Sequence, residues 1–418
     1  MHEHINNRGA SGELRTARRA PNEEVSGDES ESIALASGAV GYGAPAAWQP
    51  GEGGPSENQH GARRLRIVNT RCTLPSACVA ALLYATSLTA GCTTPQESAR
   101  RATATRVMAP LVIDVDPASE ISGVVRSVFE DSRGTIWLGG ECDLFRYDGR
   151  TLTSYAIKDD LGRGVTVKKI VEDRDGNIWC GTTGGITRID GTSFTSFGEK
   201  DGLISQDVWN MTVDPSGGIW ICTLEGACRF DGKTFTPFML PEAPPDPTRG
   251  VTSSRIVHCV MVDRGGQVWF GTNGGAYVYD GTTLKNLSER DGLPSNAVSG
   301  ILEDQSGNIW FATTHGGISW FDGTAFTNFT ELGIIEGQEI WCMHEGRSGD
   351  IWISGKRSPM YRYDGHAFTR VPEQDEITTL AFTILEDSAG RVWLGGTNGL
   401  FRRAGESFVK VTKDGPWR

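Results

Sequence analysis

Residues 291–329 read DGLPSNAVSGILEDQSGNIWFATTHGGISWFDGTAFTNF, and this stretch decides the fold. It holds four short runs of apolar and β-favouring residues, at 298–302, 308–312, 318–321 and 326–329. Each run is bounded by turn-forming residues and is too short for a stable helix. We therefore predict four short strands that form one antiparallel meander.

The connections between these runs have the composition of tight turns. Asp304 favours the start of the first turn, and Gly307 supplies a positive φ near its end. A glycine-rich loop, Thr314–Gly317, follows the second run. The pair Asp322-Gly323 separates the last two runs, and such a pair is a strong signal for a two-residue hairpin.

The same unit recurs along the chain, and its tryptophan marks each copy. The copies are centred on Trp137, Trp179, Trp220, Trp269, Trp310, Trp352 and Trp393, at intervals of 42, 41, 49, 41, 42 and 41 residues. An aspartate precedes this tryptophan by six residues in six copies, at Asp131, Asp173, Asp214, Asp263, Asp304 and Asp387. Six copies also carry the Asp-Gly pair, beginning at Asp148, Asp190, Asp231, Asp280, Asp322 and Asp364.

A lone meander of about 42 residues cannot bury both of its faces, so such units stack radially around an axis. We therefore predict an all-β fold, a seven-bladed β-propeller with four antiparallel strands per blade, over residues 120–418. Each repeated tryptophan should be a structural wedge between neighbouring blades. The longer interval holds a proline-rich insertion, Pro241–Pro247, which we expect to be a loop between blades three and four.

Two ways of completing the ring remain open. Leu111–Ile113 could add an outer strand to the last blade, or Phe408–Val411 could form that edge.

Composition agrees with a β fold and limits the partners. The chain has 54 Gly and 12 Trp, and glycine disfavours helices. The net charge of −12 argues against nucleic acid as a partner. We find no phosphate-binding loop, no Gly-x-Ser-x-Gly elbow and no His-Glu-x-x-His motif, and no cofactor or metal is evident.

The N-terminal region differs from the repeats. Residues 1–67 are polar and lack apolar periodicity, which indicates disorder or a misassigned start of translation, with Val68 as the true start. Residues 68–92 combine a basic residue, a short apolar run at 77–85 and small residues, which is the layout of a secretory signal. The run is too short to span a bilayer. Residues 93–119 are expected to be a tether with a possible closing strand.

The end of this signal, Leu88-Thr89-Ala90-Gly91-Cys92, resembles the lipobox of bacterial lipoproteins. That resemblance implies cleavage before Cys92 and lipidation of its sulfur, which would anchor the chain in the cell envelope, at the outer membrane. The alternatives are an ordinary signal cut near Ala90 or Gly91, which would release the protein, and no export at all. The pair Arg63-Arg64 could instead indicate twin-arginine export, although the residues after it fit that signal poorly.

Six cysteines lie in the repeats, at Cys142, Cys180, Cys222, Cys228, Cys259 and Cys342. None has zinc-ligand spacing. Cys222 and Cys228 flank one expected hairpin loop and could form a disulfide, or they are small buried residues.

The repeat sequence DGLPSNAVSGILEDQSGNIWFATT resembles the two-component-regulator propeller repeat of bacterial sensor proteins. That family implies an extracytoplasmic sensory propeller, often followed by a membrane helix and a kinase, and neither of these is found here. The repeats are also similar, more distantly, to streptogramin lyases, which are seven-bladed propellers. That family implies a metal-assisted reaction with a histidine base, but its constellation cannot be matched to residues of this chain.

Comparison of the copies points to one variable column. Eleven residues before each tryptophan stand Arg126, Lys168, Trp209, His258, Ser299, Trp341 and Phe382, whereas the neighbouring core column stays apolar. Aromatic and cationic side chains at the mouth of a propeller suit a planar, sugar-like or anionic ligand. The loops between second and third strands add Glu141, Asp143, Glu225, Asn273, His315, Lys356, Arg357 and Asn398.

We therefore expect a monomeric, exported, lipid-anchored propeller that binds a small molecule, a glycan or an envelope protein at this mouth. The second hypothesis is a lyase-like or glycan-acting enzyme with His258 or His315 as its base. The Glu-Asp pairs such as Glu303-Asp304 recur with the turns, so we interpret them as structural and not as a glycosidase pair.

Overall fold

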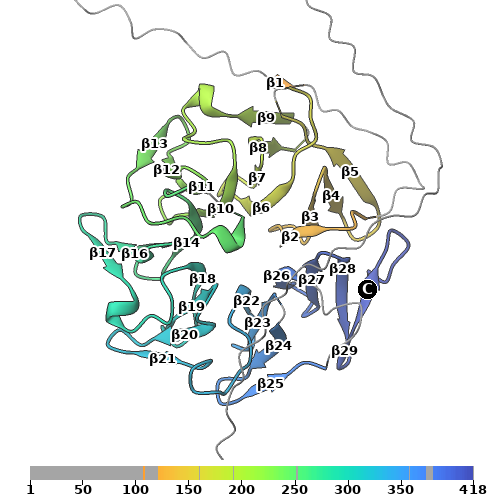
Figure 1. The fold of residues 1–418 in the computed structure, drawn as a ribbon. Coiled ribbons are helices and arrows are strands. Elements are labelled where there is room, and N and C mark those ends of the chain that lie inside the picture. Colours follow the sequence, from red (N-terminus) through yellow and green to blue (C-terminus); the bar gives the residue numbers. More distant parts are fainter. Residues whose placement is uncertain are drawn as a thin grey trace, which may run out of the picture. The chain divides into compact units, whose positions relative to one another are not determined.

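The computed structural model describes residues 107–108 and 121–417, except 160, 192, 251–252, 357 and 373–379. The predicted signal, Cys92, the Leu111–Ile113 run and Arg357 lie outside the described residues. The described chain forms seven antiparallel sheets of four consecutive strands each, arranged as blades around one axis (Figure 1). The predicted seven-bladed β-propeller is confirmed.

The strands follow the predicted runs closely. Blade 1 contains β2 (Val125–Glu130), β3 (Ile136–Gly140), β4 (Asp143–Tyr147) and β5 (Leu152–Ala156); blade 2 contains β6 (Val167–Glu172), β7 (Ile178–Thr182), β8 (Gly185–Asp190) and β9 (Ser193–Phe197). Blade 3 contains β10 (Val208–Val213), β11 (Ile219–Thr223), β12 (Gly226–Phe230) and β13 (Phe235–Phe238); blade 4 contains β14 (Val257–Val262), β15 (Val268–Thr272), β16 (Gly275–Tyr279) and β17 (Leu284–Leu287). Blade 5 contains β18 (Val298–Glu303), β19 (Ile309–Thr313), β20 (Ile318–Phe321) and β21 (Phe326–Asn328); blade 6 contains β22 (Ile340–Glu345), β23 (Ile351–Gly355), β24 (Ser358–Tyr363) and β25 (Phe368–Arg370). Blade 7 contains β26 (Ala381–Glu386), β27 (Val392–Gly396), β28 (Gly399–Ala404) and β29 (Ser407–Val411).

The remaining elements are short. Three single-turn 3₁₀ helices, η1 (Glu199–Asp201), η2 (Pro247–Arg249) and η3 (Glu289–Asp291), lie in connections between blades. A two-residue strand, β1 (Val107–Met108), pairs with the outer edge of blade 2 at β9.

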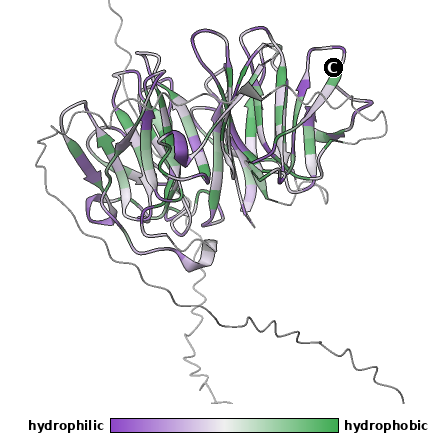
Figure 2. Ribbon diagram, turned by 90° about the horizontal axis from the view of Figure 1, so that it is seen from above, coloured by the Kyte–Doolittle hydropathy of each residue, from purple (hydrophilic) through white to green (hydrophobic). Residues whose placement is uncertain are grey.

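The innermost strand of each blade touches the innermost strands of the two neighbouring blades, and β26 of blade 7 touches β2 of blade 1. The axis is therefore surrounded by β2, β6, β10, β14, β18, β22 and β26 (Figure 1). Hydrophobic residues lie along the strands, and hydrophilic ones gather in the connections at both ends of the ring (Figure 2).

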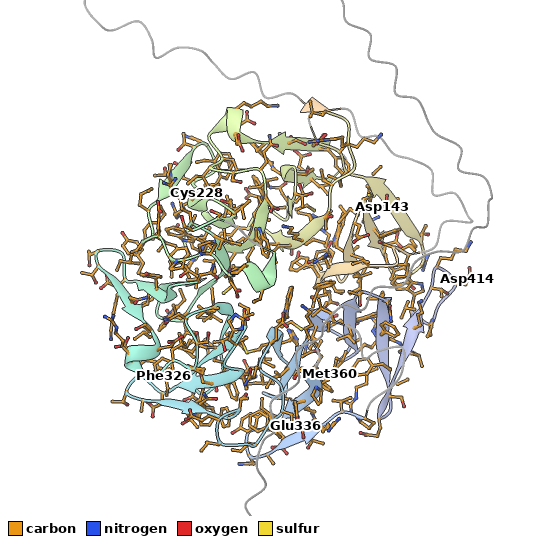
Figure 3. All side chains as sticks on the ribbon, viewed as in Figure 1. Asp143, Cys228, Phe326, Glu336, Met360 and Asp414 are labelled. Carbon is orange, nitrogen blue, oxygen red and sulfur yellow. The ribbon has the colours of Figure 1, made fainter. Side chains whose placement is uncertain are left out.

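The core is divided into seven clusters, and each cluster joins two adjacent blades. Trp179 of blade 2, for example, packs with Phe230 of blade 3, their ring centroids 5.4 Å apart. The repeated tryptophans are at most 6 % exposed, which confirms their predicted position as wedges. Because successive strand residues point to opposite faces, the residue after each tryptophan packs against the preceding blade. Side chains fill the spaces between blades all round the ring (Figure 3).

The aspartate six residues before the tryptophan fixes both the turn and the indole. In blade 5, Oδ1 of Asp304 accepts hydrogen bonds from the backbone amides of Ser306 and Asn308. Its Oδ2 accepts a hydrogen bond from the indole Nε1 of Trp310 at 2.8 Å. The indole bond recurs in blades 1, 2, 4 and 7. In blade 3, Oδ2 of Asp214 accepts instead from Nε of Arg229 at 2.7 Å.

Small residues two positions after the tryptophan allow the blades to approach closely. A Cβ added to Gly139 would lie 2.6 Å from the carbonyl oxygen of Val167 in the next blade. A Cβ added to Gly395 would lie 2.9 Å from the carbonyl oxygen of Val125, across the junction between blades 7 and 1. The recurrent Trp-x-Gly sequence is therefore a packing requirement.

The Asp-Gly pairs form hairpins, but most of these hairpins are longer than the two-residue turn that the pair indicates. The strands end before Asp148 and resume at Leu152, so four residues connect them. Oδ1 of Asp148 accepts hydrogen bonds from the amides of Arg150 and Thr151, which stabilises the longer loop. The aspartate is therefore retained because its side chain closes the loop.

The ring is completed by the C-terminal segment. Ser407–Val411 forms the outer strand β29 of blade 7, which is the second of the two predicted alternatives. Beyond it, Trp417 stacks on Tyr147 of blade 1 at a centroid distance of 4.1 Å and lies 5.9 Å from Trp393 of blade 7. The backbone carbonyl of Trp417 accepts a hydrogen bond from Arg391 at 2.9 Å.

Cys222 and Cys228 are both free and buried, so the disulfide alternative is wrong. Cys222 packs toward blade 4 and Cys228 toward blade 2, because they lie on opposite faces of the hairpin formed by β11 and β12. Burial raises the pKa of the Cys228 thiol to about 11.

Candidate functional site

The seven residues of the variable column occupy one structural position, which is a β-bulge in the innermost strand of every blade. The strand register shifts around each of them: Arg126, Lys168, Trp209, His258, Ser299, Trp341 and Phe382. A bulge leaves its residue out of the pairing ladder and re-aims the side chain. We call these seven residues the bulge ring.

On one side of the bulge ring, an arginine lies over an aromatic ring. The guanidinium of Arg126 in blade 1 lies 4.0 Å from the ring centroid of Phe382 in blade 7, a cation–π distance. Phe382 in turn lies 6.0 Å from Trp341 of blade 6. Burial lowers the pKa of Arg126, and the charge of Glu141 partly offsets this.

On the other side, a lysine and a histidine flank the second tryptophan. Nζ of Lys168 in blade 2 lies 4.1 Å from the ring centroid of Trp209 in blade 3. Trp209 meets His258 of blade 4 edge to face at 5.8 Å. Ser299 of blade 5 donates to the carbonyl of Ile340 in blade 6 at 2.5 Å. The column predicted from the sequence is thus brought together in space.

Two acidic residues that the sequence analysis missed anchor this site. Asp207 accepts from Nζ of Lys168 at 2.5 Å and from Nε1 of Trp209 at 3.1 Å. Glu339 accepts from Nε1 of Trp341 at 3.0 Å and lies 3.6 Å from Nζ of Lys356. Both carboxylates stand two residues before a bulge tryptophan, and that repeated spacing was the available sequence signal.

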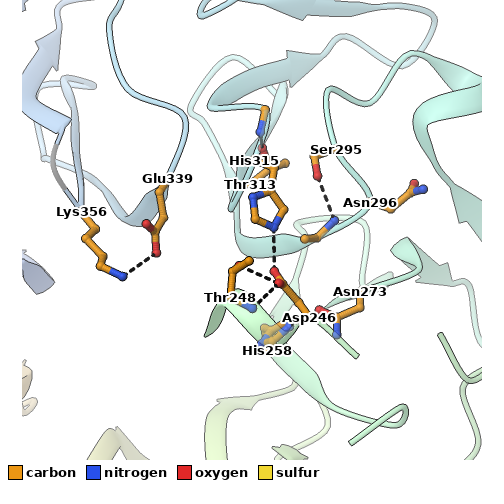
Figure 4. A network of polar contacts seen from close by, with 12 residues as sticks. Asp246, Thr248, His258, Asn273, Ser295, Asn296, Thr313, His315, Glu339 and Lys356 are labelled. Carbon is orange, nitrogen blue, oxygen red and sulfur yellow. Dashed lines mark hydrogen bonds and ion pairs between the residues drawn. The ribbon is translucent and has the colours of Figure 1, made fainter. Parts of the chain in front are cut away.

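The proline-rich insertion contributes to the same end of the ring. Asp246, which caps the 3₁₀ helix η2, lies 2.7 Å from Nε2 of His315 on the loop after β19 (Figure 4). His258 is 4 % exposed, and its Nε2 lies 2.7 Å from Oδ1 of Asn273. The insertion therefore places a carboxylate next to a histidine from another blade, 69 residues along the chain.

The other predicted loop residues lie near the site without joining it. Glu141 acts on Arg126 through charge, and Glu225 acts in the same way on Arg255. Burial raises the pKa of Asp143, which begins β4. Asn398 lies between β27 and β28.

A second lysine, Lys169, follows the bulge of blade 2 on the innermost strand β6. Burial lowers the pKa of this lysine. Cys259 of blade 4 partly offsets this lowering, and the charge of Lys169 acts on His344 of blade 6. Neither blade adjoins blade 2 in the ring. Burial, assisted by the charge of Lys169, lowers the pKa of His344 to about 4. His344 is neutral at pH 7, and its Nε2 accepts a hydrogen bond from the amide of Glu386.

The recurrent glutamates have a structural explanation, as predicted. Glu172 at the end of β6 accepts hydrogen bonds at 2.7 Å from the backbone and side chain of Ser132 in blade 1. Glu303 and Glu345 accept from the backbone amides of Arg264 and Gln305 in the turns of blades 4 and 5. Glu130 accepts from the backbone and side chain of Ser388 in blade 7. These carboxylates hold neighbouring blades together.

The described part of the chain holds neither a cluster of metal-ligating side chains nor a helix suited to cross a bilayer. No group of three or more His, Cys, Asp and Glu side chains is placed there to hold a metal ion. No helix among those residues has the length and apolar character needed to cross a bilayer.

The comparisons with known proteins agree with this architecture. The model of the family described as "Two component regulator propeller" matches residues 119–141, 162–184 and 292–315. These segments contain the first two strands of blades 1, 2 and 5. A search of curated proteins found no match.

Several solved structures share the fold at low identity. A protein described as the extracellular domain of a hybrid two-component system from B. thetaiotaomicron has a TM-score of 0.55 at 22 % identity. The match covers 67 % of this chain and 39 % of that chain. A streptogramin B lyase has a TM-score of 0.53 at 15 % identity, with 70 % and 95 % covered. A virginiamycin B lyase from Staphylococcus aureus has a TM-score of 0.54 at 15 % identity, with 68 % and 96 % covered.

The predicted resemblance is thereby confirmed: the chain is a seven-bladed propeller whose first, second and fifth blades match the two-component-regulator propeller model.

Proposed function

We propose that this protein is an exported, sensory-type propeller that binds a small planar ligand at the bulge ring. The observation that carries the proposal is the contrast between two sets of tryptophans. The seven repeated tryptophans are at most 6 % exposed, whereas Trp209 and Trp341 are only half-buried. Half-buried aromatic rings beside cations are a common feature of small-molecule sites.

The indoles are also held in fixed orientations. Asp207 and Glu339 accept from the indole nitrogens of Trp209 and Trp341, which fixes the plane of each ring. Fixed rings lose little side-chain entropy when a ligand stacks on them. A planar ligand is therefore favoured over a flexible chain.

Binding is tested by a thermal-shift and calorimetric screen of the full chain against flat carboxylates, nucleosides and sugars. Trp209→Ala with Trp341→Ala should weaken binding of any hit at least tenfold while the Tm of the free protein stays nearly unchanged. Leu284→Ala, which truncates an exposed side chain of the outermost strand of blade 4, is the control. Hits whose affinity survives the double substitution contradict this assignment of the site.

Export and lipidation are part of the proposal. The lipobox-like sequence ending at Cys92 supports them, as does the fold shared with an extracellular domain of a two-component system. Expression of the full chain in a Gram-negative host, with radiolabelled palmitate and cell fractionation, is the test. We expect the palmitate label on protein in the envelope fraction, and no label on the Cys92→Ser variant. Unlabelled protein confined to the cytosol would contradict export and lipidation.

One contact favours a second candidate, a lyase-type enzyme. The Asp246 carboxylate lies 2.7 Å from His315, and a histidine oriented by a carboxylate is the usual arrangement of a general base. Incubation with a streptogramin B, followed by mass spectrometry, tests this candidate. Turnover that disappears in His315→Gln supports it, and intact antibiotic contradicts a streptogramin lyase activity.

A further inference from the structure

We propose that the ligand of the bulge ring is a flat carboxylate, and that Arg126 and Lys169 together bind its negative charge. This inference rests on the proposed function, because it identifies the chemical class of the ligand for the same site. The balance of charge at this end of the ring supports it, together with a buried donor that the protein leaves without an acceptor.

Most carboxylates at this end already have a partner. Asp207 is engaged by Lys168, Glu339 by Lys356, and Asp246 by His315. Glu141 is exposed and acts on Arg126 through charge, without an ion pair. On the described innermost strands, Arg126 and Lys169 are therefore the cations that have no carboxylate in contact.

Arg126 has an unused donor in a buried position. Its Nε is shielded from solvent and has no hydrogen-bond partner among the described residues, while its guanidinium stacks on Phe382. A buried donor without an acceptor costs about 1–3 kcal/mol. A carboxylate can accept from Nε and one terminal nitrogen at once, which is the geometry that arginine prefers.

Lys169 is the second cation, one residue after the bulge in blade 2. The corresponding residues of the other blades are neutral: Ser127, Asn210, Cys259, Gly300, Cys342 and Thr383. The His344 imidazole, which senses the charge of Lys169 across the axis, is neutral as well because burial lowers its pKa to about 4. Among the described residues, no contact gives Lys169 a hydrogen bond or ion pair. An ammonium in this position gains from an added anion.

The aromatic residues explain why the anion should carry a flat body. Phe382 lies beside Arg126 and contacts Trp341 in turn, and Trp209 lies beside Lys168, so aromatic rings are close to the cations. A bare inorganic anion would not cover these ring faces. A carboxylate joined to a ring satisfies the cations and buries apolar area in the same site.

The test compares acids with their neutral amides on the full chain by isothermal titration calorimetry. The probes are benzoate against benzamide, and indole-3-acetate against indole-3-acetamide. We expect at least one acid to bind at concentrations up to about 1 mM and to bind at least tenfold tighter than its amide. Lys169→Met and Arg126→Gln should each remove most of this preference, and Lys285→Met, an exposed lysine on β17, should leave it unchanged.

A second measurement is the number of protons taken up when the acid binds. Because burial lowers the pKa of Lys169, an anion beside it raises that pKa and binding takes up protons at alkaline pH. Titrations in two buffers of different ionisation enthalpy measure this uptake, which Lys169→Met should abolish. Sulfate and phosphate serve as inorganic anions, and they should bind at least tenfold more weakly than the better acid.

The outcomes separate the two proposals. Equal affinity for acid and amide, with binding still dependent on Trp209 and Trp341, overturns the carboxylate inference and leaves the planar-ligand function standing. If an acid binds with the same affinity after Trp209 and Trp341 are replaced by alanine, the proposed site itself is wrong. No binding by either acid, or acid binding unaffected by Lys169→Met and Arg126→Gln, also overturns the carboxylate inference.

Discussion

Replacing Trp417 by alanine should weaken the closure of the ring. Trp417 is 7 % exposed, belongs to the cluster between blades 7 and 1, and stacks on Tyr147 across that junction. Its indole nitrogen donates to the carbonyl of Lys413 at 3.2 Å, which orients the ring.

The magnitude follows from the burial and the stack. Truncating a buried aromatic residue to alanine costs about 3–5 kcal/mol, and a segment near a chain end relaxes more easily than a central strand. We therefore expect the free energy of unfolding to fall by about 3 kcal/mol. The aromatic pair itself accounts for about 1 kcal/mol of this.

Urea denaturation, followed by circular dichroism at equilibrium, measures the loss. A decrease of about 3 kcal/mol corresponds to a fall in Tm of about 6 °C for a domain of this size. Trp417→Phe is the control, because it keeps an aromatic ring on Tyr147 and should lose less than half as much. A double-mutant cycle with Tyr147→Ala should give a coupling of about 1 kcal/mol. A loss below about 1 kcal/mol for Trp417→Ala, or a coupling near zero, would show that the ring is closed mainly by the strands.

Two other predictions concern packing and pH. Gly139→Ala should destabilise the protein by about 1–3 kcal/mol, because its Cβ would meet the Val167 carbonyl of the next blade at 2.6 Å. Gly123→Ala is the matched control, since no atom lies within 4 Å of its added Cβ, and equal urea midpoints for the two variants would refute the packing argument. Although burial raises the pKa of Asp214, hydrogen bonds from Arg229, Ser216 and Gly218 outweigh it and lower the pKa to about 2. This carboxylate therefore stabilises the fold above its ordinary pKa of 3.8, and the contribution is lost as the pH falls toward 2. Asp214→Asn should flatten the dependence of unfolding free energy on pH in that interval, and an unchanged slope in urea titrations at several acidic pH values would contradict the assignment.

The repeat pattern predicted nearly every strand because the signals are local. An aspartate at a turn, a tryptophan six residues later and a glycine-rich loop act within one hairpin, so their spacing is visible in the chain itself. The same signals were less informative about turn length. The loop that begins at Asp148 has four residues and not two, because the aspartate side chain accepts hydrogen bonds from the amides of Arg150 and Thr151.

The candidate site was predicted only in part. Comparison of the copies identified the bulge ring, because residues that differ between copies stand out against uniform core positions. Asp207 and Glu339 were missed, since their shared spacing from a bulge tryptophan occurs in only two copies and gains meaning once the indole contact is known. Ligand binding, lipidation at Cys92 and the start at Val68 remain predictions.

The amino-acid sequence by itself determined the number of blades, their strands and the wedge tryptophans, because each of these depends on residues close together in the chain. Only the tertiary structure decided that Arg126 lies on Phe382, that the charge of Lys169 reaches His344 across the axis, and that Asp246 meets His315. Contacts of this kind depend on the rotation from one blade to the next and on the course of the insertion. The physical reason for the division is that hairpin geometry is fixed by neighbouring residues, whereas the site is assembled by the closing of the ring.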